Sequence, residues 1–327
     1  MALVAAVAFQ GRNAVKAHAG FTLSLDCEGL WGMADQPDVV NAGVICDRSL
    51  SQAYGLIARV LDSHELKATC AFVSAFAAGA EALHANQPVL CELARHSPAW
   101  FAQVLPAIER GQWDGWFGNG FYTAMRDAGH EMAWHGSTHL CLADPTPADA
   151  VELELQLASS LFDAIGHTPK TIVFPRNLVG HLDRLQRAGF QTYRARPPSG
   201  FTARLSGLAN EWKVWDSRVQ AQPIRQQGWQ VSPAGFFLNW PSGVRSWVPV
   251  GVTVSRWKSL LHAAVSQGGY VHMWFHPHNL ITAPTMQGAF EQIMKEVGQL
   301  VRTGDMVSLT MSEANDHFGL GHEGGIV

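Results

Sequence analysis

Two histidines four residues apart, His135 and His139, are the residues of this chain whose type and spacing best suit metal binding. If the chain turns helical after the short apolar segment before them, side chains at i and i+4 lie on one face, about one turn apart. Two neutral imidazoles placed in this way can reach one divalent cation. The chain contains 15 histidines, so a pair at this spacing can also be a chance feature of a helix surface. Support for a metal site must come from further ligands.

Other polar residues follow directly after segments with the apolar pattern of strands. The four polar clusters at predicted strand ends are Asp26 with Glu28, His135 with His139, Arg176 with Asn177, and His276. In a parallel barrel all strands open on one face at their carboxyl ends, so these clusters would converge. Each also has a simpler explanation when taken alone, since Asp26 could cap a turn and Glu28 could be solvated.

The elements that must position these clusters alternate between strand and helix. The predicted strands are 21–25, 67–73, 131–134, 170–174, 191–194, 269–275 and 306–310, with 236–240 a weaker candidate. The predicted helices are 49–61, 121–128, 146–165, 181–188, 255–266 and 286–301, and 75–110 is mostly helical. Alternation of this kind is typical of βαβ units with parallel strands. Seven or eight units favour a barrel, and without a linker or internal repeat we expect one domain over residues 1–327, with a Gly-rich tail from about 317.

Two histidines and one carboxylate, with open positions, are the ligand set of a hydrolytic zinc site. On this hypothesis a second carboxylate is the general base for the metal-bound water, and a histidine opposite is the general acid that protonates a leaving amine. Arg176 would hold the base carboxylate ionised, because a neighbouring cation lowers the pKa of an acid. The ligand types admit Zn²⁺, Co²⁺, Ni²⁺ or Fe²⁺, of which we expect zinc first.

The composition indicates a globular protein with a well-filled core. Of its 327 residues 47% are hydrophobic and 15% charged, and the net charge is −4 without a run of lysine or arginine. This charge gives no support to nucleic-acid or anionic-membrane binding. Five cysteines without a CxxC spacing suit a reducing compartment. The apolar start, residues 1–10, lacks a basic segment before it, and no stretch is long enough for a membrane helix, so we expect a cytoplasmic protein, with peripheral attachment to a membrane as the alternative.

The order and spacing of the clusters resemble the polysaccharide deacetylase family, also called the NodB-homology or carbohydrate esterase 4 family. The first motif of that family ends a strand in Asp-Asp or Asp-x-Asp/Glu, and Asp26-Cys27-Glu28 resembles the second form. The second motif, Gly-His-Glu followed by two histidines four apart, resembles Gly129 to His139. The histidine of the fifth motif matches His276 in Trp274-Phe275-His276-Pro277.

The resemblance covers residues 21 to about 280 and implies a distorted (β/α) barrel of about seven parallel strands. By this match Asp26 would be the catalytic base and His276 the catalytic acid. The ligands of the divalent metal would be Glu28, His135 and His139.

The third and fourth motifs of the family are not matched as closely. The third is usually Arg-Pro-Pro-Tyr-Gly, and Phe174-Pro175-Arg176-Asn177 stands at the right distance with its arginine displaced by one residue. Arg196-Pro197-Pro198-Ser199-Gly200 has more of the letters but comes a whole βα unit too late, so we take Arg176 as the partner of Asp26. For the fourth motif Asp216 is only a weak candidate. These departures make an ordinary chitin or peptidoglycan deacetylase a less favoured prediction.

The leading hypothesis is a metal-dependent hydrolase that removes an acetyl or formyl group from an N-acylated amino sugar. The expected substrate is a carbohydrate, or a lipid- or nucleotide-linked amino-sugar precursor, and the oligomeric state is open. Two alternatives stand: a metal-independent cyclic-amide hydrolase like allantoinase, and a glycan-binding pseudoenzyme. The stretches 75–120 and 195–249 are expected to shape the substrate pocket. The residues predicted to contact substrate are Trp31, Trp134, Trp274, Asn177, His278 and Asn279, although tryptophans near strand ends are more often part of a core.

Overall fold

The computed structural model describes residues 18–198, 209–212 and 220–318. Residues 1–10 and Asp216, on which two of the expectations above rest, lie outside these ranges, as does the part of the tail beyond 318. The strands are β1 (Ala19–Cys27), β2 (Thr69–Phe72), β3 (Glu131–Trp134), β4 (Thr171–Ile172), β5 (Thr192–Arg194), β6 (Ile224–Gln226), β7 (Trp229–Ser232), β8 (Phe236–Phe237), β9 (Tyr270–Phe275) and β10 (Met306–Ser308).

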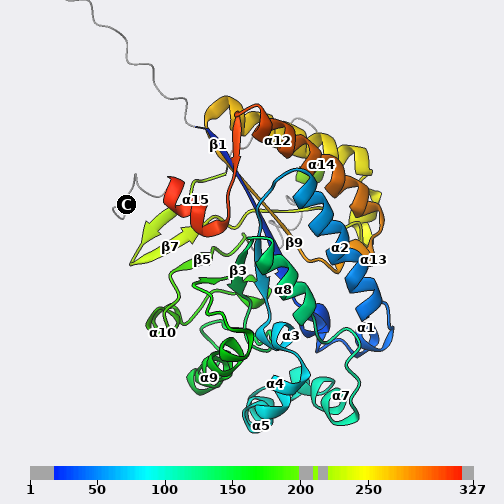
Figure 1. Cartoon of the computed structure of the whole chain (residues 1–327), viewed down its shortest axis with the longest axis vertical. Coiled ribbons are helices and arrows are strands. Elements are labelled where there is room, and N and C mark those ends of the chain that lie inside the picture. The colour runs from blue at the N-terminus through cyan, green and yellow to red at the C-terminus, as the bar shows by residue number, and fades with distance from the viewer. Residues whose placement is uncertain (1–17, 199–208, 213–219, 319–327) are drawn as a thin grey trace, which may run out of the picture.

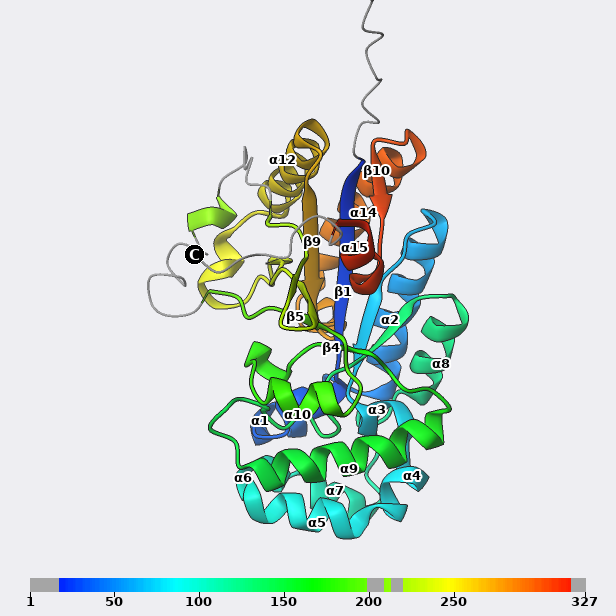
Figure 2. The ribbon, with the colours of Figure 1, turned by 90° about the vertical axis from the view of Figure 1, so that its left-hand side faces the viewer.

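The described strands form one curved sheet in the order β6-β7-β5-β4-β3-β2-β1-β9-β8, and β10 pairs with the start of β1. All pairs are parallel except β6 with β7. The sheet is thus a half-barrel. Because the strands are parallel, their carboxyl ends lie together at one edge of the sheet, next to α1, α3 and α10 (Figure 2).

Helices surround the sheet (Figure 1). The longer ones are α2 (Asp47–Ser63), α5 (Gln87–His96), α8 (Asn119–Asp127), α9 (Ala148–Ile165), α12 (Val250–Gln267), α14 (Thr285–Arg302) and α15 (Met311–Phe318). The shorter ones are α1 (Pro37–Asn41), α3 (Ser74–Ala78), α4 (Ala80–Ala85), α6 (Pro98–Phe101), α7 (Val104–Arg110), α10 (Leu182–Arg187), α13 (Asn279–Thr282) and the 3-10 turns η1 (Gly29–Met33), η2 (Pro175–Asn177) and η3 (Gly243–Trp247). Of these, α4 to α7 and α9 lie beyond the carboxyl ends of the strands (Figure 2).

The central strand β1 is buried along its whole length, yet its sequence alternates. Its odd-numbered residues, such as Phe21 and Leu23, belong to the main hydrophobic core. Its even-numbered residues Thr22, Ser24 and Asp26 are also buried, and since successive side chains of a strand point to opposite faces, they line the other side of the sheet. The alternation of apolar and polar residues in this strand therefore accounts for the polar interior of the half-barrel.

Most predicted elements are present, but several observed elements were not predicted. The hairpin β6–β7 lies in the stretch 195–249, where no clear pattern was recognised. Its two-residue turn is Gln227-Gly228, with φ of 50° and 81°. A turn of this kind needs positive φ at both positions and usually carries Asn or Asp at the first, so glutamine there hid the signal. The helices α1, α13 and α15 were also not predicted.

Candidate metal and hydrolytic site

Three predicted ligands, Glu28, His135 and His139, come together at the carboxyl ends of β1 and β3. Each offers a ligand atom within 4.8 Å of the other two, and all three side chains are buried. The Oε2 atom of Glu28 lies 3.3 Å from Nε2 of His135 and 2.8 Å from Nε2 of His139. Glu28 and His135 are the first residues after their strands; β1 continues to Cys27, two residues beyond the predicted end at 25.

The two histidines do not share a helix, so this part of the prediction is wrong. The chain after β3 is a tight loop in which Gly136 and His139 have φ of 77° and 61°. The loop folds back far enough to bring the two imidazole rings to 4.7 Å. The spacing therefore brings the ligands together through left-handed backbone rather than through the helical period.

The group has the chemistry of a cation site. Nδ1 of His135 lies 2.7 Å from the carbonyl oxygen of Val173, so Nδ1 carries a proton and Nε2 is the nitrogen that faces Glu28. That Nε2 atom and Oε2 of Glu28 are buried without a hydrogen-bond partner. Burial opposes ionisation of Glu28, but His139, His276 and His135 outweigh it and hold its pKa well below the usual value. An ionised carboxylate and two imidazoles suit Zn²⁺ and related ions.

The loop that carries His139 is held by Glu154, a buried residue of α9 that the sequence analysis missed. Its carboxylate accepts hydrogen bonds from the backbone N–H of Ser137 (2.7 Å) and of Thr138 (3.3 Å), and a short one from the Thr138 hydroxyl. Burial raises the pKa of Glu154 to about 7. A signal existed, because Glu154 lies among the apolar residues of an amphipathic helix and faces the core with them.

The predicted partnership of Asp26 with Arg176 is wrong. Asp26 is paired with Arg194, the last residue of β5, by two parallel hydrogen bonds of 2.8 and 2.7 Å. Arg176 donates instead to Asp35 at 2.6 Å. The physical reason is the backbone of η2, where Arg176 and Asn177 have left-handed φ of 55° and 56°. This turn directs Arg176 outward, while the side chain of Asn177 accepts a hydrogen bond from Arg194 at 2.7 Å.

A buried chain of hydrogen bonds fixes Arg194. Its guanidinium donates to the hydroxyl of Ser24 at 2.9 Å, and that oxygen lies 2.8 Å from Nε2 of His272. Nδ1 of His272 lies 3.0 Å from the carbonyl oxygen of Pro233. Burial lowers the pKa of His272 to about 3, so the ring is neutral and donates from Nδ1 to Pro233 while Nε2 accepts from Ser24. The donors thus run in one direction from Arg194 to Pro233.

His276 faces both carboxylates from the end of β9. Its Nε2 atom lies 3.9 Å from Oδ2 of Asp26 and 3.7 Å from Oε1 of Glu28. On the other side of the ring, Nδ1 lies 3.1 Å from Oδ1 of Asn279, which also accepts from the His276 backbone. His278 stacks on His276 at 4.9 Å, and burial lowers the pKa of His278 to about 3. Asn279 and His278, which were predicted to contact substrate, therefore contact His276, the predicted acid.

The comparisons with known proteins decide the fold. No protein-family model matches the chain, and no curated protein matches its sequence. A putative polysaccharide deacetylase from Mycobacterium smegmatis matches in structure with a TM-score of 0.57 at 14% identity, over 96% of this chain and 93% of its own. A probable polysaccharide deacetylase from Pseudomonas aeruginosa PAO1 matches with 0.53 at 12% identity, over 92% and 91%. The fold is that of the polysaccharide deacetylases.

The predicted fold class and the resemblance in fold are thus confirmed. The same fold occurs in the allantoinase PuuE, which matches with a TM-score of 0.53 at 13% identity over 95% of this chain and 94% of its own. Activity must therefore be argued from the residues of the site, because fold does not imply function. None of the helices in the described part of the chain combines the length and hydrophobicity of a membrane-spanning segment.

Of the three tryptophans predicted to contact substrate, the structure places one at the site. Trp31 is fully buried and donates from its indole nitrogen to the carbonyl of Trp116. Trp134 is also fully buried and stacks on Phe190 in a second hydrophobic core. Neither can touch a substrate in this structure, so both predictions are corrected. Trp274 remains at the site, where the Arg194 guanidinium lies 4.4 Å from its ring centre.

Proposed function

We propose that this protein is a metal-dependent hydrolase that removes an N-acyl group, acetyl or formyl, from an amino sugar. The observation that carries the proposal is the convergence of Glu28, His135 and His139 on one buried point, beside a paired Asp26 and a facing His276. The fold, shared with polysaccharide deacetylases, supports a carbohydrate substrate.

Glu28, His135 and His139 would hold a divalent cation, with zinc expected first and cobalt, nickel or iron also compatible with these ligands. Bound there, such a cation supplies Lewis acidity that polarises an amide carbonyl and makes a nearby water more acidic. The hydrogen bond from His135 to Val173 holds the proton on Nδ1 and orients Nε2 toward Glu28. Burial opposes a charge on His135, but Glu28, Asp26 and the Val173 carbonyl outweigh burial and raise its pKa, so a cation would bind in place of a proton at Nε2.

Asp26 is the proposed general base. Burial opposes its ionisation, but Arg194, helped by His135 and His276, outweighs burial and leaves the pKa of Asp26 below its usual value. The carboxylate is therefore ionised at neutral pH and can accept a proton from the attacking water. The bidentate contact with Arg194 also fixes the plane of the carboxylate.

His276 is the proposed general acid. Asn279 accepts from its Nδ1–H in both protonation states, which leaves Nε2 as the nitrogen that takes up and releases a proton. This nitrogen lies 3.9 Å from Oδ2 of Asp26 and 3.7 Å from Oε1 of Glu28, so the proposed acid and base are close enough to act on the same amide group. Proton transfer to the leaving nitrogen completes cleavage of the carbon–nitrogen bond.

The test combines metal analysis with an activity screen. We expect about one equivalent of metal in the wild-type protein and none in His135→Ala, together with release of acetate or formate from N-acylated amino sugars by the wild type alone. Cleavage of a cyclic amide by metal-free protein would support the allantoinase-like alternative. Bound metal and bound glycan without turnover of any N-acyl sugar would support the pseudoenzyme.

A further inference from the structure

The two histidines of the metal group are oriented in different ways. Nδ1 of His135 bonds to the carbonyl oxygen of Val173, whereas Nδ1 of His139 is buried and has no hydrogen-bond partner among the described residues. A histidine that binds a metal usually donates from its second ring nitrogen to a fixed acceptor, and that bond sets the direction of the ring. The orientation of His139 must therefore come from the loop that carries it.

This loop, residues 136–138, is bonded to the helices around it. Two backbone N–H groups of α3 donate to the carbonyl oxygens of Gly136 and Ser137, both at 3.0 Å. The indole nitrogen of Trp100, in α6, donates to the carbonyl oxygen of Thr138 at 2.9 Å. All three carbonyl oxygens of the loop are thus held by neighbouring helices.

Glu154 of α9 holds the donor groups of the same loop. Its carboxylate accepts from the backbone N–H groups of Ser137 at 2.7 Å and of Thr138 at 3.3 Å, and from the hydroxyl of Thr138. Glu154 has no exposed surface, and no ion pair joins it to a basic residue in the described part of the chain. Burying a carboxylate in this way is costly. An apolar side chain would pack at less cost but would leave the N–H groups of the loop unsatisfied.

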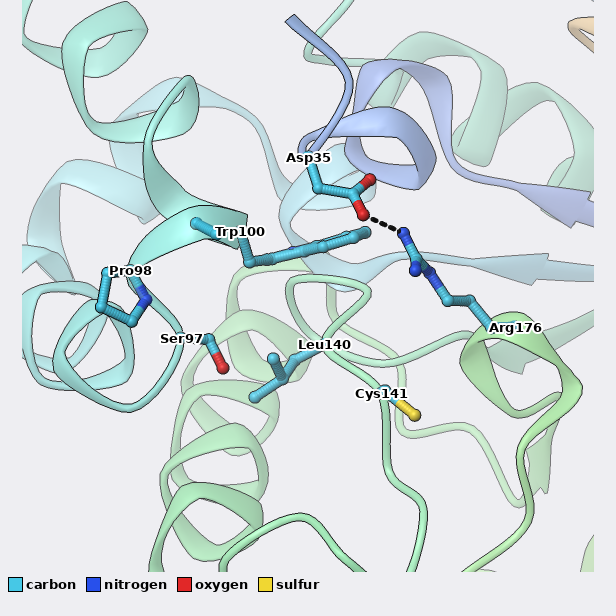
Figure 3. A pocket seen from close by; sticks show the side chains of 8 residues that line it. Asp35, Ser97, Pro98, Trp100, Leu140, Cys141 and Arg176 are labelled. Carbon is cyan, nitrogen blue, oxygen red and sulfur yellow. Dashed lines mark hydrogen bonds and ion pairs between the residues drawn. The ribbon is translucent and has the colours of Figure 1, made fainter.

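The next residue after the loop is His139, and its position depends on its backbone and on ring stacking. Its φ of 61° is left-handed, a conformation that persists at such a residue only where the surrounding structure fixes it. Its ring stacks on Trp100 at 5.7 Å, and Trp100 in turn lies 4.8 Å from the guanidinium of Arg176 (Figure 3). Neither contact uses a ring nitrogen of His139, and its Nε2 atom lies 2.8 Å from Oε2 of Glu28.

We propose that Glu154 is a positioning residue of the metal site, which sets the metal affinity by holding the 136–138 loop so that Nε2 of His139 faces Glu28. This inference rests on the metal site of the proposed function. Glu154 thus does for His139 what the bond to a carbonyl oxygen does for His135. Because Glu154 is outside the group that converges on the cation, its effect on turnover comes through the metal.

The experiment measures the metal affinity of the full chain without substrate. Metal-free protein is titrated with Zn²⁺ against a competing chelator, and with Co²⁺, whose visible absorption depends on the number and geometry of its ligands. In Glu154→Leu we expect Kd for Zn²⁺ to rise about 10–100-fold, the usual effect of losing a residue that supports a metal ligand, and the Co²⁺ spectrum to change. Glu154→Gln keeps an acceptor oxygen at the same reach and should restore most of the affinity.

Controls on the same helix separate a positioning role from a structural one. Leu161 is also buried in α9, so Leu161→Ala should lower the temperature of thermal unfolding without changing Kd. Glu152→Gln removes an exposed carboxylate and should change neither. If Glu154→Leu does not fold, Thr138→Val carries the test, because it deletes only the hydroxyl that donates to Glu154. Its Kd should rise about threefold or more, as expected for one lost hydrogen bond.

The outcomes separate this role from the proposed reaction. Wild-type Kd and Co²⁺ spectrum in folded Glu154→Leu, or in Thr138→Val where it carries the test, would overturn the positioning role and keep the hydrolase. An equal rise of Kd in Leu161→Ala would also overturn it, since a general loss of stability would then account for the effect. Affinity that depends on Glu154, without turnover of any N-acyl sugar, would keep the role and overturn the hydrolase. Wild-type protein that binds neither ion would overturn both.

Discussion

Two arginine–aspartate pairs lie at the carboxyl end of the half-barrel, and they differ chiefly in burial. Arg194 and Asp26 have side-chain exposures of 0% and 2%, and two parallel hydrogen bonds join their charged groups. Arg176 and Asp35 have exposures of 43% and 32% and share one hydrogen bond. The residue types are the same, so the environment must account for any difference in role.

Burial fixes the contact between Arg194 and Asp26, whereas the exposed contact between Arg176 and Asp35 can be replaced by contacts with other groups. A charge removed from water must keep its partner, because a buried unpaired ion costs several kcal/mol. An exposed pair contributes only about 0.2–1 kcal/mol, since water competes for both groups. Arg194 therefore serves to hold a carboxylate ionised and in place. Arg176 and Asp35 can give up part of their contact to water or to a solute at little cost.

The largest expected effect is on turnover in Asp26→Asn. Removing the proposed base should lower kcat by about 10²–10⁴-fold, the usual contribution of general base catalysis. Metal content should remain that of the wild type, because Asp26 is outside the group that converges on the cation. The measurement is acetate release from N-acetylglucosamine together with elemental analysis. Asp35→Asn is the matched control and should keep the wild-type kcat. Full activity in Asp26→Asn would refute the assignment of the base.

The second effect is on stability, and it compares the two arginines directly. Arg194→Met leaves the Asp26 carboxylate buried without its partner and should lower the free energy of unfolding by about 3–5 kcal/mol. Arg176→Met breaks a half-exposed pair and should lower it by less than about 1 kcal/mol. Urea unfolding followed by tryptophan fluorescence gives both values. Equal losses would mean that burial does not distinguish the pairs.

The third effect is the pH dependence of the Asp26 contribution. The folded pKa of Asp26 lies below its ordinary value of 3.8, so the unfolded chain binds more protons there and stability rises with pH across this window. The contribution is fully present above pH 3.8 and is lost as the pH falls through the folded pKa. The stability difference between wild type and Asp26→Asn should therefore shrink below pH 4. A difference that stays constant down to acid unfolding would contradict a lowered pKa.

The rule that functional residues follow parallel strands identified Asp26 but not its partner Arg194. Asp26, Glu28, His135 and His276 were recognised because parallel strands end at the same face, and this holds without knowledge of side-chain packing. Arg194 obeys the same rule as the last residue of a predicted strand. It was passed over because Arg176, one unit earlier, stood at the expected distance in the chain.

What the sequence could not supply is the direction of side chains where the backbone is irregular. Positive φ at Arg176 turns that residue away from the interior, and arginine carries no sequence signal for such a conformation. Trp134 and His135 are adjacent, so when the histidine points into the site the tryptophan must point into the core. Glu154 and Trp100 support the loop at His139 through packing of distant elements, which no local pattern encodes.

The smallest effect, and the sharpest test of the comparison, is the response of each pair to salt. A double-mutant cycle on Asp35 and Arg176 should give a coupling free energy of about 0.2–1 kcal/mol at low ionic strength. At 1 M salt this coupling should fall toward zero, because the Debye length shrinks from about 10 Å at 0.1 M to about 3 Å. The cycle on Asp26 and Arg194 should give a larger coupling that changes little, since salt does not screen a pair enclosed by protein. Salt-independent coupling between Asp35 and Arg176 would show that this pair, too, is shielded from water, and the contrast between the two pairs would then lose its physical basis.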